Sequence, residues 1–359
     1  MGARLEKLRE LLSEHELDAI LISIPENRRY ISGFTGSWGY LFVTHEDAVL
    51  CTDFRYVEQA SRQSQGFTVQ RVGGTSDWFL NLLSELGAKR IGFESGHISV
   101  ATYNTFLKLF EKATGDSKPE LVATIDLVEK QRAVKDSKEL KLLERAVEIT
   151  DHAIEKIREA IRPGMTEAQI AWELEKTMRE GGAEGLSFDI IVGAGSNGSM
   201  AHHRADDTII KQGEPIVIDM GCTYEGYASD LTRTLFVGKP DDKFRQIYDI
   251  VLEAQITAEE QVRSGMTGEQ IDAIARKIIG DAGHKENFGH SLGHGIGLEV
   301  HEHPRVGPKA DDVLEDNMVF TIEPGIYLSG WGGVRIEDMV VLENGRARVL
   351  SKAAKGSPV

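Results

Sequence analysis

Cysteine and long apolar runs are both scarce in this sequence. Cys51 and Cys222 are its only cysteines, which excludes a disulfide framework and a zinc site built from several thiolates. No segment approaches the roughly 18 consecutive apolar residues of a transmembrane helix. Residues 3–18 carry charges of both signs, unlike the apolar core of a signal peptide. We therefore expect a cytoplasmic protein with no membrane partner.

Positive charge is also in short supply. Lys and Arg total 41 residues against 57 Asp and Glu, so the formal net charge is −16. Nucleic acid is therefore not an expected partner, because its recognition relies on Lys and Arg contacts with phosphate. The composition, with 41% hydrophobic and 27% charged residues, is that of a globular protein whose excess acid is available to metal cations.

Two familiar site motifs give no support for other chemistries. The H-E-x-x-H pattern of thermolysin-type zinc sites does not occur. Residues 193–198 (GAGSNG) match the dinucleotide pattern G-x-G-x-x-G, but that fingerprint needs a helix to open there. The sequence that follows, SMAHHRADD, is a poor helix start, so we do not expect nucleotide binding.

The chain is long enough for two domains, with 359 residues. In residues 1–125, short apolar runs alternate with helical periodicity, which is typical of an α/β domain with a mixed or parallel sheet. The predicted helices are 3–15, 54–63, 76–86 and 102–114, and the predicted strands are 18–23, 39–44, 48–52, 67–72, 90–94 and 121–125. No metal-ligand spacing occurs among these residues, so we expect a structural role for this domain.

A densely charged segment begins near residue 126. Residues 129–148 have helical periodicity, and Asp136 is a plausible start for a helix. We therefore predict a linker at residues 126–136 and a second domain at residues 137–359.

The second domain contains an internal repeat. Residues 162–170 (RPGMTEAQI) and 263–271 (RSGMTGEQI) share Arg, Gly, Met, Thr, Gln and Ile at the same positions. Each copy follows one amphipathic segment and opens another, with Thr166 and Thr267 as predicted N-caps. Two copies are too few for a solenoid, so we predict a duplicated α/β domain whose halves pack about a pseudo-twofold axis.

Four acidic residues follow the same repeat. Asp219 lies at the end of an apolar run, and Glu323 lies in the corresponding strand of the second half. Asp230 heads the next strand, and Glu337 lies in its counterpart. Twofold packing would bring these carboxylates together, which like-charge repulsion opposes unless cations lie between them. Hard divalent cations with oxygen ligands meet this requirement.

Histidines cluster in residues 288–304 (FGHSLGHGIGLEVHEHP), which hold four histidines and two glutamates among four glycines. Histidine binds metals or carries a proton near neutral pH, and glycine lets backbone and ligand approach closely. His294 is the natural nitrogen ligand, because it lies in the apolar GHGIG and not in the charged HEHP.

Each of these residues alone has a simpler interpretation. Asp219 fits a strand-end turn, Asp230 a cap, and Glu337 a surface ion pair with Arg335. The histidines alone fit a polar surface loop. Their joint occurrence in a repeated pattern favours a two-metal site.

The order of the motifs resembles the metallopeptidases of the pita-bread fold, which include methionine aminopeptidase, aminopeptidase P and prolidase. The motifs are IDMG, SDLTRT, GHGIGLEVHE, TIEPGIY and RIEDM, within residues 218–339. Residues 27–37 (NRRYISGFTGS) and 52–60 (TDFRYVEQA) resemble the creatinase/prolidase-type N-terminal domain, which methionine aminopeptidase lacks. The resemblance covers essentially the whole chain and implies an α/β N-terminal domain before a pita-bread catalytic domain.

By this resemblance the ligands are divided between two divalent metal ions. Asp219 binds one ion, and His294 and Glu323 bind the other. Asp230 and Glu337 bridge both. The ions would share a water and lower its pKa, so that a bridging hydroxide attacks the peptide carbonyl, with Glu323 as the candidate to move the proton. Mn is the first expectation for the metal, with Co, Zn or Fe as alternatives.

The resemblance also implies residues that face the substrate. His202 and His301 would polarise the carbonyl oxygen, and Arg305 matches an arginine that faces the substrate carboxylate in prolidases. Ala201 stands where family members often have proline. The choice between His202 and the adjacent His203 is therefore open, with His202 preferred.

The remaining histidines of the 288–304 stretch are expected in lesser roles, His290 behind the ligands or near the substrate and His303 at the surface. The implied activity is hydrolysis of the peptide bond before proline, in Xaa-Pro dipeptides or at the N-terminus of short peptides, and the choice between the two stays open. A homodimer is also implied. The alternatives are a methionine aminopeptidase-like enzyme and a metal-free, creatinase-like relative.

Overall fold

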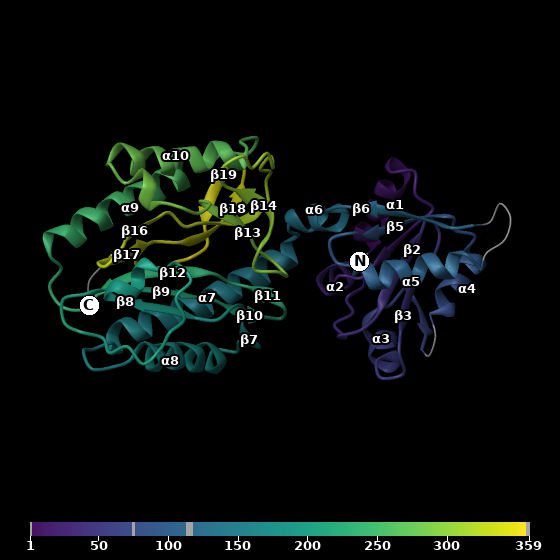
Figure 1. The fold of residues 1–359 in the computed structure, drawn as a ribbon, viewed down its shortest axis with the longest axis horizontal. Helices are drawn as coiled ribbons and strands as arrows, with labels where there is room; N and C mark the ends of the chain where they lie inside the picture. The colour runs from purple at the N-terminus through teal and green to yellow at the C-terminus, as the bar shows by residue number, and fades with distance from the viewer. Residues whose placement is uncertain (1, 74–75, 113–117, 357–359) are drawn as a thin grey trace. The chain divides into compact units, whose positions relative to one another are not determined.

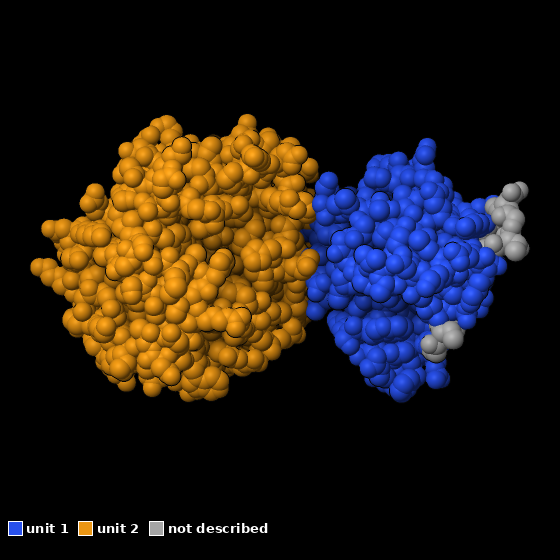
Figure 2. All heavy atoms as spheres, viewed as in Figure 1, with its two compact units in different colours: residues 1–132 blue, residues 133–359 orange. Residues whose placement is uncertain are grey.

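The computed structural model describes residues 2–73, 76–112 and 118–356. The chain divides into two compact units, residues 1–132 and residues 133–359 (Figure 2). This division falls inside the segment 126–136 that the sequence predicts as a linker. Within the described residues, no helix is long and apolar enough to cross a membrane.

Unit 1 is built on a six-stranded sheet with the order β4-β3-β2-β1-β5-β6. The β1–β2 and β2–β3 pairs are antiparallel, whereas β3–β4, β1–β5 and β5–β6 are parallel. The prediction of an α/β domain with a mixed or parallel sheet is therefore confirmed. The strands are β1 (Ala19–Ile22), β2 (Tyr40–Thr44), β3 (Ala48–Thr52), β4 (Thr68–Arg71), β5 (Arg90–Glu94) and β6 (Glu120–Thr124).

Helices pack around this sheet (Figure 1). Phe79 on α4 lies against Phe106 and Phe110 on α5, with ring centroids 4.4 and 5.9 Å apart. The last residues of the predicted helix 102–114 lie outside the described residues. The helices of this part of the chain are α1 (Gly2–Glu14), α2 (Pro25–Ser32), α3 (Val57–Gln63), α4 (Asp77–Leu86), α5 (Val100–Phe110) and α6 (Leu127–Ala133).

Helix α2 is not predicted by the sequence, because its residues, PENRRYIS, are mostly polar. Proline in its first turn and Gly33 in a left-handed conformation at its C-terminus delimit it. Asn27 and Arg28 are nevertheless buried. They are satisfied by distant partners, since the Asn27 amide donates to Glu94 and the Arg28 guanidinium donates to the carbonyl of Gly39.

Unit 2 consists of two halves, each with two long helices and a set of strands (Figure 1). The first half contains α7 (Ser137–Ala160), α8 (Glu167–Glu180), β7 (Gly185–Leu186), β8 (Ile191–Ala194), the 3₁₀ helix η2 (Gly195–Ser199), β9 (Pro215–Met220), β10 (Cys222–Tyr224), β11 (Tyr227–Ala228) and β12 (Leu231–Phe236). The second half contains α9 (Asp242–Gln261), α10 (Gly268–Asp281), the 3₁₀ helix η3 (Lys285–Asn287), β13 (Gly293–Gly295), β14 (Glu302–Val306), β15 (Val319–Ile322), β16 (Gly325–Leu328), β17 (Gly332–Arg335), β18 (Asp338–Glu343) and β19 (Arg346–Val349).

The strands of unit 2 lie between the two helix pairs (Figure 1). The sheets have the orders β12-β9-β8, β14-β13-β15-β18-β19, β11-β10-β7 and β16-β17. One apolar core packs around α9 and α10 and another around α7 and α8. Each half therefore buries its own helices against its own strands, as a duplicated domain should.

The sequence repeat marks equivalent helix starts. Thr166 caps α8 and Thr267 caps α10, each through a capping box that a glutamine three residues later completes. Each threonine also forms an isolated antiparallel bridge, Thr166 with Ile209 and Thr267 with Val313. Both predicted N-caps are confirmed, and the two helix starts hold equivalent chain segments.

Candidate active site

A cavity of about 640 Å³ is lined by residues from both halves of unit 2. Every metal-ligand and substrate residue predicted from the sequence lines it. Those residues are Asp219, Asp230, His294, Glu323, Glu337, His202, His301 and Arg305. Side chains separated by more than 130 positions in the chain therefore share one wall.

The ends of antiparallel strands deliver the four carboxylates. Asp219 lies in β9 and pairs with Thr232 of β12, while Asp230 directly precedes β12. In the second half, Glu323 directly follows β15 and Glu337 directly precedes β18. The end of one strand and the start of its antiparallel neighbour meet at the same edge of a sheet, so each half presents two acids together.

His294 lies among these carboxylates. Its Nε2 atom is 3.6 Å from Asp230 Oδ2 and 3.5 Å from Glu323 Oε1. Ligand atoms of Asp230, His294 and Glu337 lie within 4.8 Å of one another. The Thr232 hydroxyl orients Glu337 by donating to its Oε2 at 2.7 Å.

Burial and mutual repulsion shift the pKa values of this cluster. Burial, reinforced by the charge of Glu337, raises the pKa of Asp230 and of Glu323 well above the usual range. Burial and the charge of Asp219 raise the pKa of Glu337 to about 8. Burial also lowers the pKa of His294 to about 4, so its ring is neutral and able to act as a metal ligand.

Arg335 is a part of the site that the sequence reasoning missed. It is 3% exposed, and its Nη2 donates to Asp219 Oδ2 at 2.6 Å while its Nε donates to Thr232 Oγ1 at 3.1 Å. The simpler interpretation of Glu337 as the partner of Arg335 in a surface ion pair is wrong, because both are buried and Arg335 pairs with Asp219. The sequence offered one signal for this role, since Arg335 lies between two of the clustered acids, Glu323 and Glu337.

The donor set fits divalent metal ions. Asp219 Oδ1 is buried and has no hydrogen-bond partner among the described residues. A buried carboxylate oxygen without a donor is costly, and a cation supplies the missing contact. Carboxylate oxygens and one neutral imidazole are ligands that Mn, Fe, Co and Zn accept.

Exposed basic residues also line the cavity, among them His202, His301 and Arg305. The His301 ring lies 4.2 Å from the His294 ring, centroid to centroid, and burial lowers its pKa. His202 lines the same cavity, and its charge also contributes to lowering the pKa of His301. Arg305 is exposed, and its backbone N–H donates to Asp312 Oδ2 at 2.6 Å.

The neighbouring histidines have other partners. His203 Nε2 donates to Glu167 Oε2 at 2.7 Å, and His303 Nδ1 lies 2.9 Å from Asp312 Oδ2. The prediction of a surface position for His303 is wrong, since its side chain is only 14% exposed. Its carboxylate partner lies nine residues later, which the sequence pattern did not signal.

His290 lines the cavity behind the carboxylates. Its Nε2 lies 2.9 Å from the Tyr327 hydroxyl, which accepts a hydrogen bond from Arg335 Nη1 at 2.7 Å. His290 Nδ1 donates to the Ser291 carbonyl at 2.8 Å, so in a neutral ring Nε2 has no proton and accepts from the Tyr327 hydroxyl. Burial lowers the pKa of His290 to about 4, in agreement with a neutral ring. Tyr327 was not singled out from the sequence.

Two glycine-rich patterns in unit 2 have structural explanations. A Cβ on Gly193 would lie 2.9 Å from the Cα of Gly198, so the glycines of GAGSNG allow the end of β8 to pack closely against the 3₁₀ helix η2, which begins at Gly195. Residues 289–293 (GHSLG) match the G-x-S-x-G pattern of serine hydrolases. They lie between η3 and β13 and so lack the strand–turn–helix that presents such a serine.

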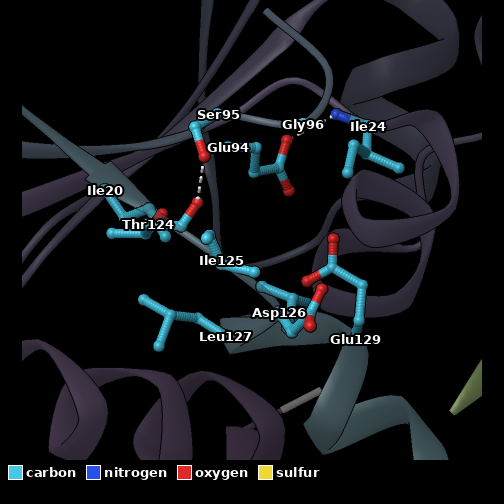
Figure 3. A pocket seen from close by; sticks show the side chains of 11 residues that line it. Ile20, Ile24, Glu94, Ser95, Gly96, Thr124, Ile125, Asp126, Leu127 and Glu129 are labelled. Atoms are coloured by element: carbon cyan, nitrogen blue, oxygen red, sulfur yellow. Dashed lines mark hydrogen bonds between the residues drawn. The ribbon is translucent and has the colours of Figure 1, made fainter.

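A smaller cavity, of about 220 Å³, lies in unit 1 (Figure 3). The Glu94 carboxylate reaches it, and burial raises the pKa of that group. Glu94 already accepts hydrogen bonds from the backbone of Ser23 and Ile24 and from the Asn27 amide. These bonds tie β5 to the start of α2, so Glu94 has a structural role.

The fold and the site together define a class. A duplicated α/β domain whose halves both contribute carboxylates to one histidine-containing cavity is a metallopeptidase of the pita-bread fold. The chain belongs to metallopeptidase family M24, whose model matches residues 141–344, and it carries a creatinase/prolidase N-terminal domain over residues 4–134.

Relatives match the chain over nearly its whole length. It is 38% identical over 356 residues to the Xaa-Pro dipeptidase of Pyrococcus horikoshii, covering 99% of this chain and 98% of that protein. The structure of the Xaa-Pro dipeptidase from Bacillus anthracis has a TM-score of 0.95 and 40% identity, covering 100% of this chain and 99% of that one. The X-Pro aminopeptidase from Thermotoga maritima has a TM-score of 0.88 and 38% identity, covering 97% and 99%.

Proposed function

We propose that this metallopeptidase hydrolyses the peptide bond before proline, in Xaa-Pro dipeptides or at the N-terminus of short Xaa-Pro peptides. The observation that carries the proposal is the cavity in which Asp219, Asp230, His294, Glu323 and Glu337 face exposed His202, His301 and Arg305. The names of the relatives, and the creatinase/prolidase domain, support the Xaa-Pro class over a methionine aminopeptidase.

The carboxylates and His294 are proposed to hold two divalent ions, with Mn as the first candidate. Asp219 would help to hold one ion, His294 and Glu323 would help to hold the other, and Asp230 and Glu337 would contribute ligand oxygens to both. Bound at such a site, divalent ions supply Lewis acidity and lower the pKa of water. Arg335 keeps Asp219 oriented by its hydrogen bond to Oδ2, which leaves Oδ1 for the metal.

The protein groups around the scissile bond have separate tasks. Glu323 accepts a proton from the attacking water on its carboxylate and donates it to the leaving proline nitrogen. His202 and His301 donate hydrogen bonds to the carbonyl oxygen as negative charge develops on it. Arg305 binds the free carboxylate of a dipeptide, for which its guanidinium has a matching geometry.

The test is hydrolysis of Xaa-Pro and Xaa-Pro-Xaa peptides by purified protein stripped of metal and reloaded with Mn, Co, Fe or Zn in turn. We expect hydrolysis of Xaa-Pro with about two ions bound per chain. Failure to cleave either peptide with each metal would refute the proposal. Cleavage of the tripeptide at a rate comparable with the dipeptide would identify an aminopeptidase and exclude a strict requirement for the proline carboxylate.

The Asp230→Asn variant tests the bridging assignment. We expect it to lose activity and bound metal together, because an amide removes the negative charge that two cations share. The metal-free variant should be at least as stable as the parent, since burial disfavours the Asp230 charge. Metal analysis and urea unfolding measure the two effects, and full activity with full metal content would contradict the assignment.

A cytoplasmic homodimer is also proposed, on the family resemblance alone. Size-exclusion chromatography with light scattering measures the mass directly, and a monomer at working concentrations would reject the dimer.

A further inference from the structure

We propose that Glu167 and His203 are positioning residues that hold the adjacent His202 at the cavity wall. The proposal rests on the proposed function, because the role of His202 in carbonyl binding belongs to it. It concerns the first turn of α8 and the segment from the end of β8 to Thr208, which are joined by hydrogen bonds in the first half of unit 2.

The carboxylate of Glu167 is fully buried and joins both ends of that segment. Its Oε1 accepts from the backbone N–H of Ala194 at 2.8 Å and from the Asn197 amide at 3.0 Å. Its Oε2 accepts from His203 Nε2 at 2.7 Å and from the backbone N–H of Asp206 at 3.3 Å. One side chain therefore fixes the segment before and after His202.

The backbone of the same helix start adds to this attachment. The Glu167 N–H donates to Thr208 O at 3.1 Å, and the Ala168 N–H donates to Asp206 O at 2.9 Å. These groups have no partner inside the helix, because the first N–H groups of a helix lack intrahelical acceptors. Two N–H groups at the start of α8 therefore hold the loop, while the N–H of Gln169 is capped by the Thr166 hydroxyl.

His203 transmits this attachment to His202. The His203 N–H donates to Met200 O at 3.0 Å, which closes a turn with His202 next to its end. Both histidines line the cavity, but the His203 side chain is only 10% exposed and is bonded to Glu167, whereas His202 is exposed. The His202 ring makes no hydrogen bond to the described residues, so its direction depends on its anchored neighbour.

The second half of unit 2 also holds a histidine with a carboxylate, but the carboxylate comes from a different position. Gly268 takes the place of Glu167 in the repeat, and a Cβ there would lie 2.0 Å from Arg305 O. No side chain can extend from that position, and Asp312 supplies the carboxylate instead. Its Oδ2 engages both His303 Nδ1 and the N–H of Arg305. In each half, a carboxylate holds a histidine beside a proposed substrate-binding residue.

The three groups Glu167, His203 and Asp206 lie close enough to suggest a metal site instead. The hydrogen bonds favour the positioning role, because both oxygens of Glu167 already accept two donors each. A carboxylate has about four acceptor positions, so none is left for a cation.

The test is a double-mutant cycle on the metal-loaded protein, with kcat and KM for an Xaa-Pro dipeptide. His203→Ala should lower kcat roughly 10- to 100-fold with metal content unchanged, the size of effect seen when the partner of a site residue is removed. His203→Gln, which keeps an N–H donor for Glu167, should recover most of this loss. In the His202→Ala background, His203→Ala should have little further effect, because residues that act through one another are not additive.

The matched control is Asp151→Ala, which removes a carboxylate that also accepts two backbone N–H groups, those of Lys352 and Ala353, away from the cavity. It should leave kcat near the parental value. A loss of the same size from His203→Ala in both backgrounds would show a general structural role and overturn the proposal. Loss of a further metal equivalent in His203→Ala would overturn it in favour of a metal site.

A readout without catalysis separates this proposal from the proposed function. Histidine ring NMR of the parent and of His203→Ala reports the environment of His202, assigned through His202→Ala. We expect the His202 signal to broaden or move toward free-histidine values in His203→Ala and to return in His203→Gln. An unchanged His202 signal would overturn the positioning role, whereas absence of Xaa-Pro hydrolysis in the parent would reject only the proposed function.

Discussion

The buried guanidinium of Arg335 lies among several carboxylates of the cavity. It bonds to Asp219, while Asp230, Glu323 and Glu337 have no cationic side chain of their own among the described contacts. A buried carboxylate without a counter-charge holds its proton more tightly. Metal-free protein therefore keeps protons at this site that bound cations would displace.

This proton uptake predicts a pH dependence of stability for the metal-free protein. The pKa of Glu337 is raised to about 8, and burial and the charge of Asp338 raise the pKa of Glu259 to about 7. Both groups therefore favour the folded state at low pH. Their stabilising contribution is complete below the ordinary glutamate value and disappears as the pH rises through the folded values. The pKa values of His290 and His294 are lowered to about 4. These two groups therefore make stability rise with pH, but only between about pH 4 and pH 6.5.

Only the carboxylate effect remains above pH 6.5, so stability should fall from there to pH 8. We expect a loss of about 2 kcal/mol, since one proton held only by the folded state changes stability by up to about 1.4 kcal/mol per pH unit. Urea unfolding in the presence of a chelator measures it. Repeating the series with Mn bound should flatten the profile, and a metal-free protein that is more stable at pH 8 than at pH 6.5 would contradict the expectation.

At the scale of elements, the starts of α8 and α10 combine helix capping with attachment of the segments that carry the proposed substrate-binding residues. Thr166 and Thr267 satisfy the helix N–H groups in the same way. The next residue differs, being a long buried side chain in one helix and Gly268 in the other. At Gly268 the strand that carries Arg305 comes directly against the helix backbone.

The contact at Gly268 predicts opposite effects for two alanine substitutions in α10. Gly268→Ala should cost about 1–3 kcal/mol, because its Cβ would meet the Arg305 carbonyl and neither backbone can move freely. Gly280→Ala, in the same helix, meets only the Lys285 Cβ at 3.9 Å and should stabilise by up to about 1 kcal/mol through higher helix propensity. Urea unfolding of both variants is the measurement, and equal effects would show that the close contact is unimportant.

Local sequence signals predicted most elements of the fold. Alternation, apolar periodicity, capping residues and the repeated nonapeptide depend on neighbours within a few positions, which the sequence displays directly. Helix α2 escaped because its buried Asn27 and Arg28 are satisfied by residues far along the chain, including Glu94 and Gly39. A polar helix without an apolar face carries no periodic signal.

At the scale of unit 2, the C-terminal segment joins the two halves. Lys352 and Ala353 donate backbone N–H groups to Asp151 of α7 in the first half. Lys355 donates its Nζ to Glu259 of α9 and to Asp338 in the second half, each at 2.7 Å. The end of the described chain therefore fastens helices that lie on opposite sides of the strands (Figure 1).

Removing the Lys355 charge should destabilise unit 2 in a pH-dependent way. Lys355→Met removes a cation that lies next to both Glu259 and Asp338. We expect the variant to lose about 2 kcal/mol of unfolding free energy at pH 8. This is less than the usual cost of breaking a buried ion pair, because the lysine side chain is 24% exposed. The cost should shrink at pH 6, where Glu259 takes up a proton. Urea unfolding at both pH values measures this, with Lys352→Met, an exposed lysine of the same segment, as the control. Equal loss in both variants would contradict the assignment.

The sequence by itself determined the two-domain order, the duplicated second domain, and the identities of the clustered acids and His294. The acids follow from strand ends and repeat spacing, because antiparallel neighbours bring such positions together, and His294 follows from its apolar, glycine-rich surroundings. The tertiary structure decided which groups those acids contact: Arg335 with Asp219, and Tyr327 with His290. It also paired His203 with the buried Glu167, a partner 36 positions earlier in the chain. Partners of this kind are chosen by three-dimensional proximity, which no local pattern encodes.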